Sequence, residues 1–376
     1  MMENKGHIVI SANVSWYLYN FRKNTIKELI SLGHDLTVVS SRDHTSKKLE
    51  SLGCEVIDID LDSSGKNPFK DLYIIYKIYK IYSEIVPDLI LNFTPKINIY
   101  STLAAYLLRI KCINNIAGLG TIFIDNNLLS KFVGYLYGLS QPFAHRVFFQ
   151  NEEDQNYFIE KGWVTKERSI RIMGSGVDLN HFQVKESNDD GFIRFIFIGR
   201  LLKEKGLLDL VEAIKILKKK YMDFELMILG PFDNKKKNQP SIEDINHWTK
   251  DKYIKYIGFK EDVEAYLAES DCIVLPSYYR EGVPKSLLEA AAMGKPIITT
   301  DTIGCRDVVD DGINGFLIQP RDIQGLVDKM ELVINMSHQV RLEMGLNGRK
   351  KIESQFDEKK VIQEYINVLE TTIPNG

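Results

Sequence analysis

Short apolar runs alternate with longer helical patterns along the whole chain, and this alternation limits the fold more than any other feature. Short apolar runs of this kind are typical of buried strands. The runs are HIVIS (7–11), DLTVVSS (35–41), DLILNF (88–93), RVFFQN (146–151), IRFIFIG (193–199), FELMILG (224–230), YIKYIG (253–258), CIVLPS (272–277) and PIITTD (296–301). Because strands that alternate with helices form parallel sheets with helices on both faces, we predict a doubly wound α/β fold.

The chain of 376 residues is long enough for two domains of ordinary size. The segment QVKESNDDGF (183–192) is polar, and the strand–helix pattern restarts after it. We therefore predict a Rossmann-like domain over 1–182, a second over 193–350, and a C-terminal helix at 351–376 that crosses back to the first domain. A ligand is expected at the carboxyl ends of the strands, in the cleft between the two halves.

Composition excludes several classes of protein. A net charge of −3 argues against a general nucleic-acid binder, which would carry a basic excess. No apolar run approaches the roughly 18–20 residues that span a bilayer, and the N-terminus has no signal-peptide pattern. The four cysteines, Cys54, Cys112, Cys272 and Cys305, lack metal-binding spacing and indicate buried thiols in a reducing cytoplasm.

The segment REGVPKSLLEAAAMGKPIITTD (280–301) places two acids around the start of a predicted helix. Pro284 suits the first helical turn and Gly294 ends the helix, so Glu281 precedes the helix and Glu289 lies inside it. The unpaired N–H groups near the helix start and the charge of Lys285 suit a phosphate, while the carboxylates suit sugar hydroxyls. The alternative is that both glutamates are solvated acids near the helix end.

The segment GRLLKEKG (199–206) follows the first strand of the second predicted domain. Arg200 and Lys205 are two cations at the carboxyl end of a strand, where they suit a diphosphate. Gly199 and Gly206 allow a close approach of the backbone. A surface salt bridge would explain this pair alone, but two such motifs at equivalent strand ends favour a binding site.

The motifs IGRLLKEKG, LPSYYREGVPKSLLEAAAMGKPIITTD and DVVDDGINGFLI resemble the C-terminal half of the retaining glycosyltransferase family 4. The stretches NFRKNTIKELISLGHDLTVVSS, AGLGTIFI, FFQNEEDQNYFIEKG and IMGSGVDLNHF are similar to its N-terminal half. This resemblance covers nearly the whole chain and implies the GT-B fold, in which two Rossmann-like domains face each other across a cleft. It points to the bacterial branch that adds sugars, such as N-acetylgalactosamine, to lipid-diphosphate-linked acceptors.

The resemblance also implies a role for each matching residue. Glu289 would hold the ribose of a UDP-sugar, Glu281 would bind the donor sugar, and Arg200 and Lys205 would clamp the diphosphate. The remaining donor-binding residues would be Gly199, Gly258, Phe259, Gly282, Val283, Pro284, Lys285 and Ser286. Transfer would occur on the front face, with the leaving phosphate accepting the acceptor's proton, so neither a cofactor nor a metal is expected.

The N-terminal half departs from the family pattern at two places. Ala117 precedes Gly118 and Gly120 where many relatives have a histidine that contacts the donor sugar. The usual glycine pair is replaced by SANVSWYLYNFR (11–22), in which we expect Asn20 to cap the helix that follows. We expect Asn20 and Arg22 to meet the acceptor's phosphate, and Gly118 and Gly120 to line the same acceptor site. The alternative is a simple cap and a solvated arginine.

Two further segments bear on partners. The D-x-D spacing in DIDLD (58–62) matches manganese sites of other glycosyltransferases, but its alternation also matches a half-buried strand, which we favour. In FKDLYIIYKIYKIYSEIV (69–86) the stripe of Ile74, Ile78, Ile81 and Ile85 faces the core, and its Tyr and Lys residues suit a lipid headgroup layer. Between Lys96 and Arg146 five basic residues, Lys96, Arg109, Lys111, Lys131 and Arg146, stand against one acid, Asp125. This patch predicts contact with an anionic membrane, on the inner face of the cell membrane.

The leading hypothesis is thus a retaining transferase that moves a hexose or N-acetylhexosamine from UDP to a lipid-linked or surface glycan. A UDP-sugar epimerase would need acid and base residues at the sugar carbon, and the sequence shows no such cluster. A protein that binds nucleotide sugar without turnover is a third possibility, which the complete motif set disfavours.

Overall fold

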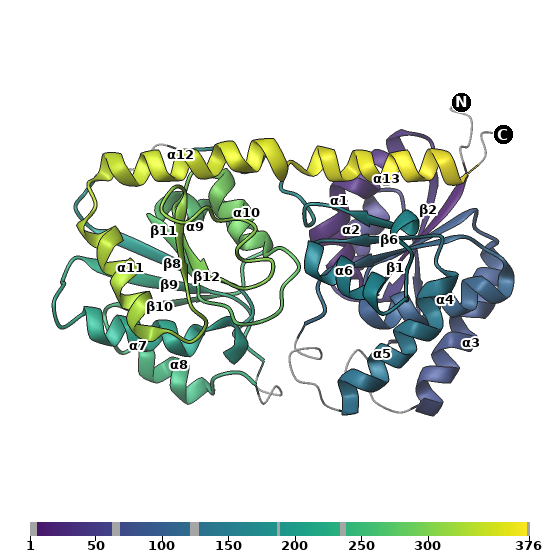
Figure 1. Ribbon diagram of the computed structural model, residues 1–376, viewed down its shortest axis with the longest axis horizontal. Coiled ribbons are helices and arrows are strands. Elements are labelled where there is room, and N and C mark those ends of the chain that lie inside the picture. Colours follow the sequence, from purple (N-terminus) through teal and green to yellow (C-terminus); the bar gives the residue numbers. More distant parts are fainter. Residues whose placement is uncertain (1–5, 62–67, 121–127, 186–188, 234–237, 374–376) are drawn as a thin grey trace. The chain divides into compact units, whose positions relative to one another are not determined.

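The computed structural model describes residues 6–61, 68–120, 128–185, 189–233 and 238–373. The chain divides into two compact units. One comprises 1–175 together with 359–376, and the other comprises 176–358. The polar segment 183–192 therefore belongs to the second unit, and the C-terminal residues return to the first (Figure 1).

In the described part of the first unit, seven parallel strands form a sheet in the order β3-β2-β1-β4-β5-β6-β7. The strands are β1 (His7–Val14), β2 (Asp35–Ser41), β3 (Glu55–Asp58), β4 (Leu89–Asn92), β5 (Cys112–Ile116), β6 (Arg146–Phe149) and β7 (Ser169–Arg171). The helices are α1 (Ser15–Ser31), α2 (Ser46–Ser51), α3 (Pro68–Ile85), α4 (Pro95–Leu108), α5 (Leu128–Ser140), α6 (Glu152–Glu160) and α13 (Glu358–Thr372), with 3₁₀ turns η2 (Gln141–Phe143) and η3 (Lys166–Arg168).

In the described part of the second unit, six parallel strands follow the order β10-β9-β8-β11-β12-β13. The strands are β8 (Ile193–Ile198), β9 (Phe224–Leu229), β10 (Ile254–Gly258), β11 (Cys272–Leu275), β12 (Ile297–Thr300) and β13 (Gly315–Ile318). The helices are α7 (Leu207–Leu217), α8 (Ile242–Trp248), α9 (Glu264–Glu269), α10 (Lys285–Ala292), α11 (Ile323–Asn335) and α12 (His338–Gln355), with the 3₁₀ turn η4 (Lys203–Lys205).

Each sheet reverses its strand order at one place, between β1 and β4 in the first unit and between β8 and β11 in the second. Each half therefore has the doubly wound α/β architecture that the sequence predicts. At such a reversal the connections leave in opposite directions and open a crevice beyond the carboxyl ends of the strands. The segments that follow β8 and β11 are thus the natural place for a ligand site.

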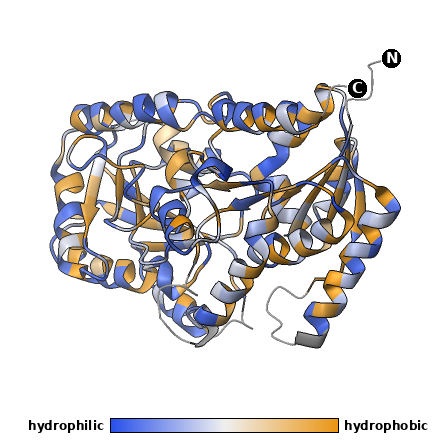
Figure 2. Ribbon diagram, turned by 45° about the vertical axis from the view of Figure 1, so that its right-hand side comes forward, coloured by the Kyte–Doolittle hydropathy of each residue, from blue (hydrophilic) through white to orange (hydrophobic). Residues whose placement is uncertain are grey.

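The sheet of the first unit is buried on both faces because its strands carry apolar residues at successive positions. Ile8 and Ile10 belong to one core cluster, and Val9 belongs to the cluster on the opposite face. Figure 2 shows hydrophobic residues along the strands inside each unit. This continuous apolar pattern is what parallel strands covered by helices on both sides require.

The C-terminal region forms two helices. Helix α12 packs against α10 in the second unit, and α13 packs on the first. Val361, Tyr365 and Leu369 of α13 lie in the same core cluster as strand β1. The backbone oxygen of Thr372 accepts a hydrogen bond of 2.9 Å from the Lys111 ammonium.

The four cysteines are buried, free thiols, as the sequence predicts. Burial raises the pKa of the Cys54, Cys112 and Cys305 thiols to about 11. Within the described ranges, no helix is both long and apolar enough to cross a bilayer.

Candidate active site

The two motifs singled out in the second unit follow neighbouring strands on either side of the strand-order reversal. Arg200 lies two residues beyond β8, and the loop that carries Glu281 follows β11. Strands β8 and β11 pair in parallel, with Cys272 opposite Phe195. Both motifs therefore lie at the same edge of the sheet, where the side chains of Lys205 and Glu281 meet.

Lys205 and Glu281 form a buried ion pair. The Lys205 Nζ contacts the Glu281 Oε1, and the two side chains are only 10% and 11% exposed. The same carboxylate oxygen accepts a hydrogen bond of 3.1 Å from the Ser277 hydroxyl. Because a buried charged side chain is tolerated only when it is paired and hydrogen-bonded, these contacts explain how a lysine and a glutamate can both be buried here.

Tyr279 contacts both cations of the predicted diphosphate site. Its ring centroid lies 5.8 Å from the Arg200 guanidinium carbon and 5.6 Å from the Lys205 ammonium nitrogen. The negative face of an aromatic ring attracts cations at this range. Sequence reasoning missed Tyr279 because its two cation partners lie more than 70 residues away in the chain. It missed Ser277 because a serine in a turn shows no role until its contact with Glu281 is seen.

Helix α10 begins at Lys285, so Pro284 occupies the cap position and the helix starts one residue later than predicted. Glu289 lies one turn into the helix, with its Oε1 3.5 Å from the Lys285 Nζ. Burial raises the pKa of Glu289, and the Lys285 charge opposes this shift. Glu281 and Glu289 are 9% and 8% exposed, so the alternative of two solvated acids near the helix end is wrong.

Two glycines let the site loops approach closely. A Cβ atom on Gly206 would lie 2.0 Å from the Pro276 carbonyl oxygen, and one on Gly304 would lie 1.6 Å from that of Gly282. Both glycines also adopt positive φ angles, which side chains disfavour. At Gly199 a Cβ atom would meet the Phe197 ring at 3.7 Å, an ordinary contact distance, so packing around a Cβ does not require glycine there.

The other predicted donor-binding residues lie around these two loops. Gly282, Val283 and Pro284 are buried, Lys285 and Ser286 are half-buried, and Gly258 ends β10 beside the exposed ring of Phe259. The His181 Nε2 lies 3.2 Å from the Asp262 Oδ1, and the charges of both residues influence the pKa of Glu289. The sequence did not reveal the His181–Asp262 pair because the two residues are 81 positions apart.

The prediction that Asn20 caps a helix is wrong. Helix α1 already begins at Ser15, with Val14 in the cap position. Asn20 lies in its second turn, where its Nδ2 donates a hydrogen bond of 2.8 Å to the Trp16 oxygen. The aromatic residues of SWYLYN concealed this early start, because aromatic side chains favour strands.

Arg22 is not the solvated arginine of the alternative reading. Its side chain is 1% exposed, and its guanidinium carbon lies 4.8 Å from the Phe93 ring centroid and 5.6 Å from that of Tyr365. In the described residues its nitrogen atoms make no hydrogen bond of normal geometry. Burial raises the pKa of Tyr17 and the Arg22 guanidinium opposes this shift, so the Tyr17 hydroxyl lies near the guanidinium. Arg22 is buried because it lies on the i, i+4 stripe between Leu18 and Ile26.

Gly118 and Gly120 follow the carboxyl end of β5, with φ angles of 99° and 64°. They border residues 121–127, which lie outside the described part of the chain. The acceptor roles of Asn20, Arg22 and these glycines stay predictions.

The D-x-D segment begins at the end of β3. The Asp58 Oδ1 accepts backbone hydrogen bonds of 3.3 Å from Arg42 and 3.0 Å from Asp60, so this carboxylate shapes a turn. Asp62 lies outside the described residues. In the ranges that the structure describes, no three His, Cys, Asp or Glu side chains are grouped so that they could hold a metal ion.

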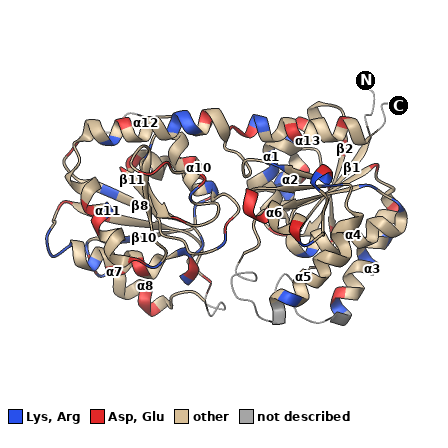
Figure 3. Ribbon diagram, viewed as in Figure 1, with Lys and Arg blue, Asp and Glu red and all other residues tan. Residues whose placement is uncertain are grey.

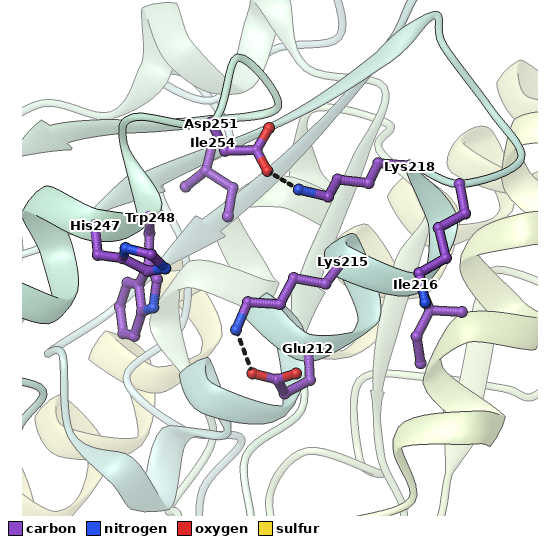
Figure 4. A pocket seen from close by; sticks show the side chains of 9 residues that line it. Glu212, Lys215, Ile216, Lys218, His247, Trp248, Asp251 and Ile254 are labelled. Carbon is purple, nitrogen blue, oxygen red and sulfur yellow. Dashed lines mark hydrogen bonds and ion pairs between the residues drawn. The ribbon is translucent and has the colours of Figure 1, made fainter.

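A cavity of about 400 Å³ lies elsewhere in the second unit, between α7 and α8 (Figure 4). Its lining residues are Glu212, Lys215, Ile216, Lys218, Lys219, His247, Trp248, Asp251 and Ile254. The Lys215 Nζ pairs with the Glu212 Oε1 at 2.7 Å, and Lys218 pairs with Asp251. None of the predicted site residues lines this cavity.

Comparison with known proteins agrees with this architecture. The family model "Glycosyl transferases group 1" matches residues 179–351, and "Glycosyl transferase 4-like" matches residues 7–151. The structure resembles that of Anabaena Alr3699/HepE in complex with UDP-glucose, with a TM-score of 0.79 at 18% identity, covering 97% of this chain and 100% of that one. A glycosyltransferase from Rickettsia africae has a TM-score of 0.78 at 20% identity, covering 99% and 100%. The fold is therefore that of a GT-B glycosyltransferase.

Curated relatives extend over nearly the same length. The N,N'-diacetylbacillosaminyl-diphospho-undecaprenol α-1,3-N-acetylgalactosaminyltransferase of Campylobacter jejuni is 28% identical over 95% of this chain and 96% of its own. The UDP-Gal:α-D-GlcNAc-diphosphoundecaprenol α-1,3-galactosyltransferase of Escherichia coli is 27% identical over 77% and 76%. The chain belongs to the group 1 and family 4-like glycosyltransferases, and it is an enzyme of that class.

Proposed function

We propose that this enzyme transfers a hexose or an N-acetylhexosamine, such as N-acetylgalactosamine, from a UDP-sugar to a polyprenyl-diphosphate-linked glycan, with retention of configuration. The observation that carries the proposal is the meeting of Lys205 and Glu281 at the strand-order reversal of the second unit. The names of the Campylobacter and Escherichia relatives support the lipid-linked acceptor, and the UDP-glucose complex of the Anabaena protein supports the donor.

The donor's diphosphate binds Arg200, Lys205 and the start of helix α10. These groups supply a guanidinium, an ammonium and the unpaired backbone N–H groups of a helix start, all of which favour phosphate oxygens. Glu289 accepts hydrogen bonds from the ribose hydroxyls, and Glu281 accepts them from the donor sugar.

In this proposal the enzyme accelerates the reaction by stabilising the negative charge that builds on the leaving group. The bond between the sugar's anomeric carbon and the phosphate oxygen breaks, and negative charge builds on the departing UDP. The acceptor hydroxyl bonds to the anomeric carbon from the same face and gives its proton to the leaving phosphate. Arg200 and Lys205 stabilise the departing charge, and losing one such contact costs about 3–4 kcal/mol of activation free energy. Because these cations neutralise the diphosphate, transfer proceeds without a metal.

The lipid-linked acceptor lies at a membrane. The first unit contacts this membrane through the exposed residues of α3, α4, α5 and η2, which we call the α3–α5 surface. Helix α4 packs between α3 and α5, and all three helices cover one face of the sheet. Exposed apolar side chains gather on them and on η2: Leu72, Tyr73, Tyr76, Tyr106, Leu107, Phe132, Tyr135, Leu139 and Phe143. Apolar and aromatic residues in such numbers are typical of a surface that docks on lipid.

Basic residues accompany this apolar set (Figure 3). Lys70, Lys80, Arg109 and Lys131 are exposed on or beside the same helices. Three members of the predicted patch are engaged within the unit, since Lys96 pairs with Asp71 at 3.4 Å, Lys111 binds Thr372, and Arg146 donates to the His145 oxygen at 2.9 Å. Lys80 lies 3.7 Å from Glu84 in an exposed pair. The remaining cations suit anionic headgroups, which attract basic residues by about 1 kcal/mol each. This surface supports a peripheral, cytoplasmic location on the inner face of the membrane.

The proposal is tested by incubating the purified protein with radiolabelled UDP-GalNAc, UDP-GlcNAc, UDP-galactose or UDP-glucose and a polyprenyl-diphosphate-linked sugar. We expect one donor to label the lipid, in the presence of EDTA, with retained anomeric configuration. Glu281→Ala abolishes this transfer, whereas Glu212→Ala, which removes an exposed glutamate of the same unit, does not. Isomerised donor in the absence of acceptor would instead identify an epimerase, and binding of donor without any turnover would identify a silent binding protein.

A further inference from the structure

The hydroxyl of Ser277 occupies a central position in the loop that follows strand β11. Ser277 is 0% exposed. Its Oγ lies 3.1 Å from the Glu281 Oε1 and accepts a hydrogen bond of 3.2 Å from the Tyr279 backbone N–H. The Glu204 carbonyl oxygen is a second possible acceptor at 3.4 Å. Because the hydroxyl has a single proton and the carboxylate is nearer and charged, the hydrogen bond to Glu281 is the favoured one.

Ser277 and Lys205 bind the same carboxylate oxygen from two different segments. Lys205 reaches Glu281 Oε1 from η4, while Ser277 reaches it from the end of β11. Two donors on one oxygen restrict the rotamer of the Glu281 side chain far more than either would alone. The same contacts hold the Lys205 ammonium, which has lost most of its access to water.

The backbone around Ser277 is itself held in place. Its carbonyl oxygen accepts hydrogen bonds from the hydroxyls of Thr300 and Thr302. The preceding Pro276 oxygen packs against Gly206, where a Cβ atom would come within 2.0 Å. The hydroxyl of Ser277 therefore projects from a rigid segment, which is what a group that orients another side chain requires.

We infer that Ser277 is a positioning residue for the donor sugar: it fixes the Glu281 carboxylate, which in turn holds the Lys205 ammonium. The sugar end and the diphosphate end of the donor are then recognised by one preorganised group of side chains. This inference rests on the proposed roles of Glu281 and Lys205, and it adds a residue that touches neither substrate.

The test compares Ser277→Ala with Ser270→Ala, a matched control in the same unit. Ser270 is also buried, and its hydroxyl donates 2.9 Å to the Leu267 carbonyl oxygen, away from the site. Loss of a hydrogen bond to a charged group predicts that Ser277→Ala lowers kcat/KM for the UDP-sugar by about 10- to 100-fold. The Kd of UDP, which lacks the sugar, changes by about threefold at most, because Lys205 keeps its partner. Ser270→Ala changes neither quantity.

Two further variants make the result specific. Ser277→Thr keeps the hydroxyl and restores most of kcat/KM. Ser277→Cys keeps the size of the side chain but donates a hydrogen bond only weakly, so it behaves like Ser277→Ala. The cysteine variant takes the place of Ser277→Ala in the test if the alanine variant does not fold. In a Glu281→Asp background with measurable turnover, Ser277→Ala has a much smaller effect than in the wild type, because the distance from Ser277 to the shorter carboxylate has already changed.

The outcomes separate this inference from the proposed function. If Glu281→Ala abolishes transfer but Ser277→Ala matches Ser270→Ala, the positioning role of Ser277 is overturned and the proposed function stands. If Ser277→Ala lowers the affinity for UDP as much as kcat/KM, its effect is a general disturbance of the site, which also overturns the inference. If Glu281→Ala leaves transfer intact, both proposals fail together.

Discussion

The Lys205 ammonium contacts the Glu281 carboxylate in the interior of the second unit, although the two residues are 76 positions apart in the chain. Each belongs to a motif that follows a different strand, and the pairing of β8 with β11 brings the motifs together. Because the family resemblance implies a diphosphate-binding role for Lys205 and a sugar-binding role for Glu281, their contact would link the two ends of the proposed donor.

Removing one member of this pair destabilises the fold more than removing both. Lys205→Met or Glu281→Gln leaves its partner in a buried site without its counter-charge, and we expect each to lower the free energy of unfolding by about 3–5 kcal/mol. The double variant should be clearly more stable than the sum of the single losses predicts. Urea denaturation followed by circular dichroism measures all four proteins, and additive losses would show that the two charges are not coupled.

Substitutions of Arg22 distinguish a role in stability from a role in acceptor binding. Its guanidinium is buried against two aromatic rings and makes no hydrogen bond of normal geometry in the described structure, so Arg22→Met should leave the free energy of unfolding unchanged or raise it by about 1–4 kcal/mol. Arg22→Ala removes the packing as well and should lower it by about 2–5 kcal/mol.

Transfer assays at low acceptor concentration then test the acceptor role of Arg22. A binding role predicts that Arg22→Met loses activity although its stability is kept, and that the loss appears mainly in the KM for the acceptor. Wild-type kinetics in a stable Arg22→Met protein would show that Arg22 only packs against Phe93 and Tyr365.

Lys295 gives the second unit a pH-dependent stability. Burial lowers the pKa of its ammonium from 10.5 to about 8, although its Nζ donates 2.9 Å to the Ala268 oxygen. The folded protein therefore releases this proton more readily than the unfolded chain, so its contribution to stability rises as pH increases from about 8 to about 10.5.

The variant Lys295→Met isolates this effect. The free energy of unfolding of Lys295→Met should exceed that of the wild type by the largest amount at pH 7. This difference should shrink by about 1–3 kcal/mol towards pH 10. Denaturation curves for the two proteins across this range measure the difference, and a difference that does not vary with pH would contradict the shifted pKa.

The α3–α5 surface should control membrane binding without affecting stability. Leu72, Leu107 and Phe132 are 66%, 66% and 53% exposed, so replacing all three with serine should change the free energy of unfolding little. It should weaken binding to vesicles that contain anionic lipid by at least about tenfold, since each buried apolar side chain contributes about 1.5–3 kcal/mol.

The matched control replaces Met222, Ile313 and Leu332, which are exposed apolar residues of the second unit. Flotation of both triple variants with anionic and with neutral vesicles distinguishes lipid docking from a general loss of hydrophobicity. Equal binding of both variants would rule out the α3–α5 surface as the membrane contact.

The apolar runs in the sequence predict β1, β2, β4, β6 and β8 to β12, and they miss β3, β5, β7 and β13, of which β5 is concealed by polar residues. Strand β5 reads CINNI, and its asparagines conceal it because polar side chains argue against a buried strand. In the structure Asn114 accepts a hydrogen bond of 2.8 Å from Asn92 and donates one of 2.8 Å to Thr102. These partners come from other elements, so local pattern does not reveal them.

The same distinction holds for the site. Glu281, Glu289, Arg200 and Lys205 stand out because charged residues beside glycines follow apolar strands. Ser277 is a common residue in a turn, and only its contact with Glu281 gives it a role. Arg22 could have been recognised as buried, since its helical stripe with Leu18 and Ile26 is present in the sequence.

A crystal structure of the protein with UDP tests most directly where the nucleotide binds. We predict diphosphate oxygens within about 2.7–3.2 Å of Arg200 and Lys205 and of the N–H groups at the start of α10, with the ribose hydroxyls on Glu289. UDP bound in the cavity between α7 and α8, or anywhere else away from Lys205 and Glu281, would contradict the account.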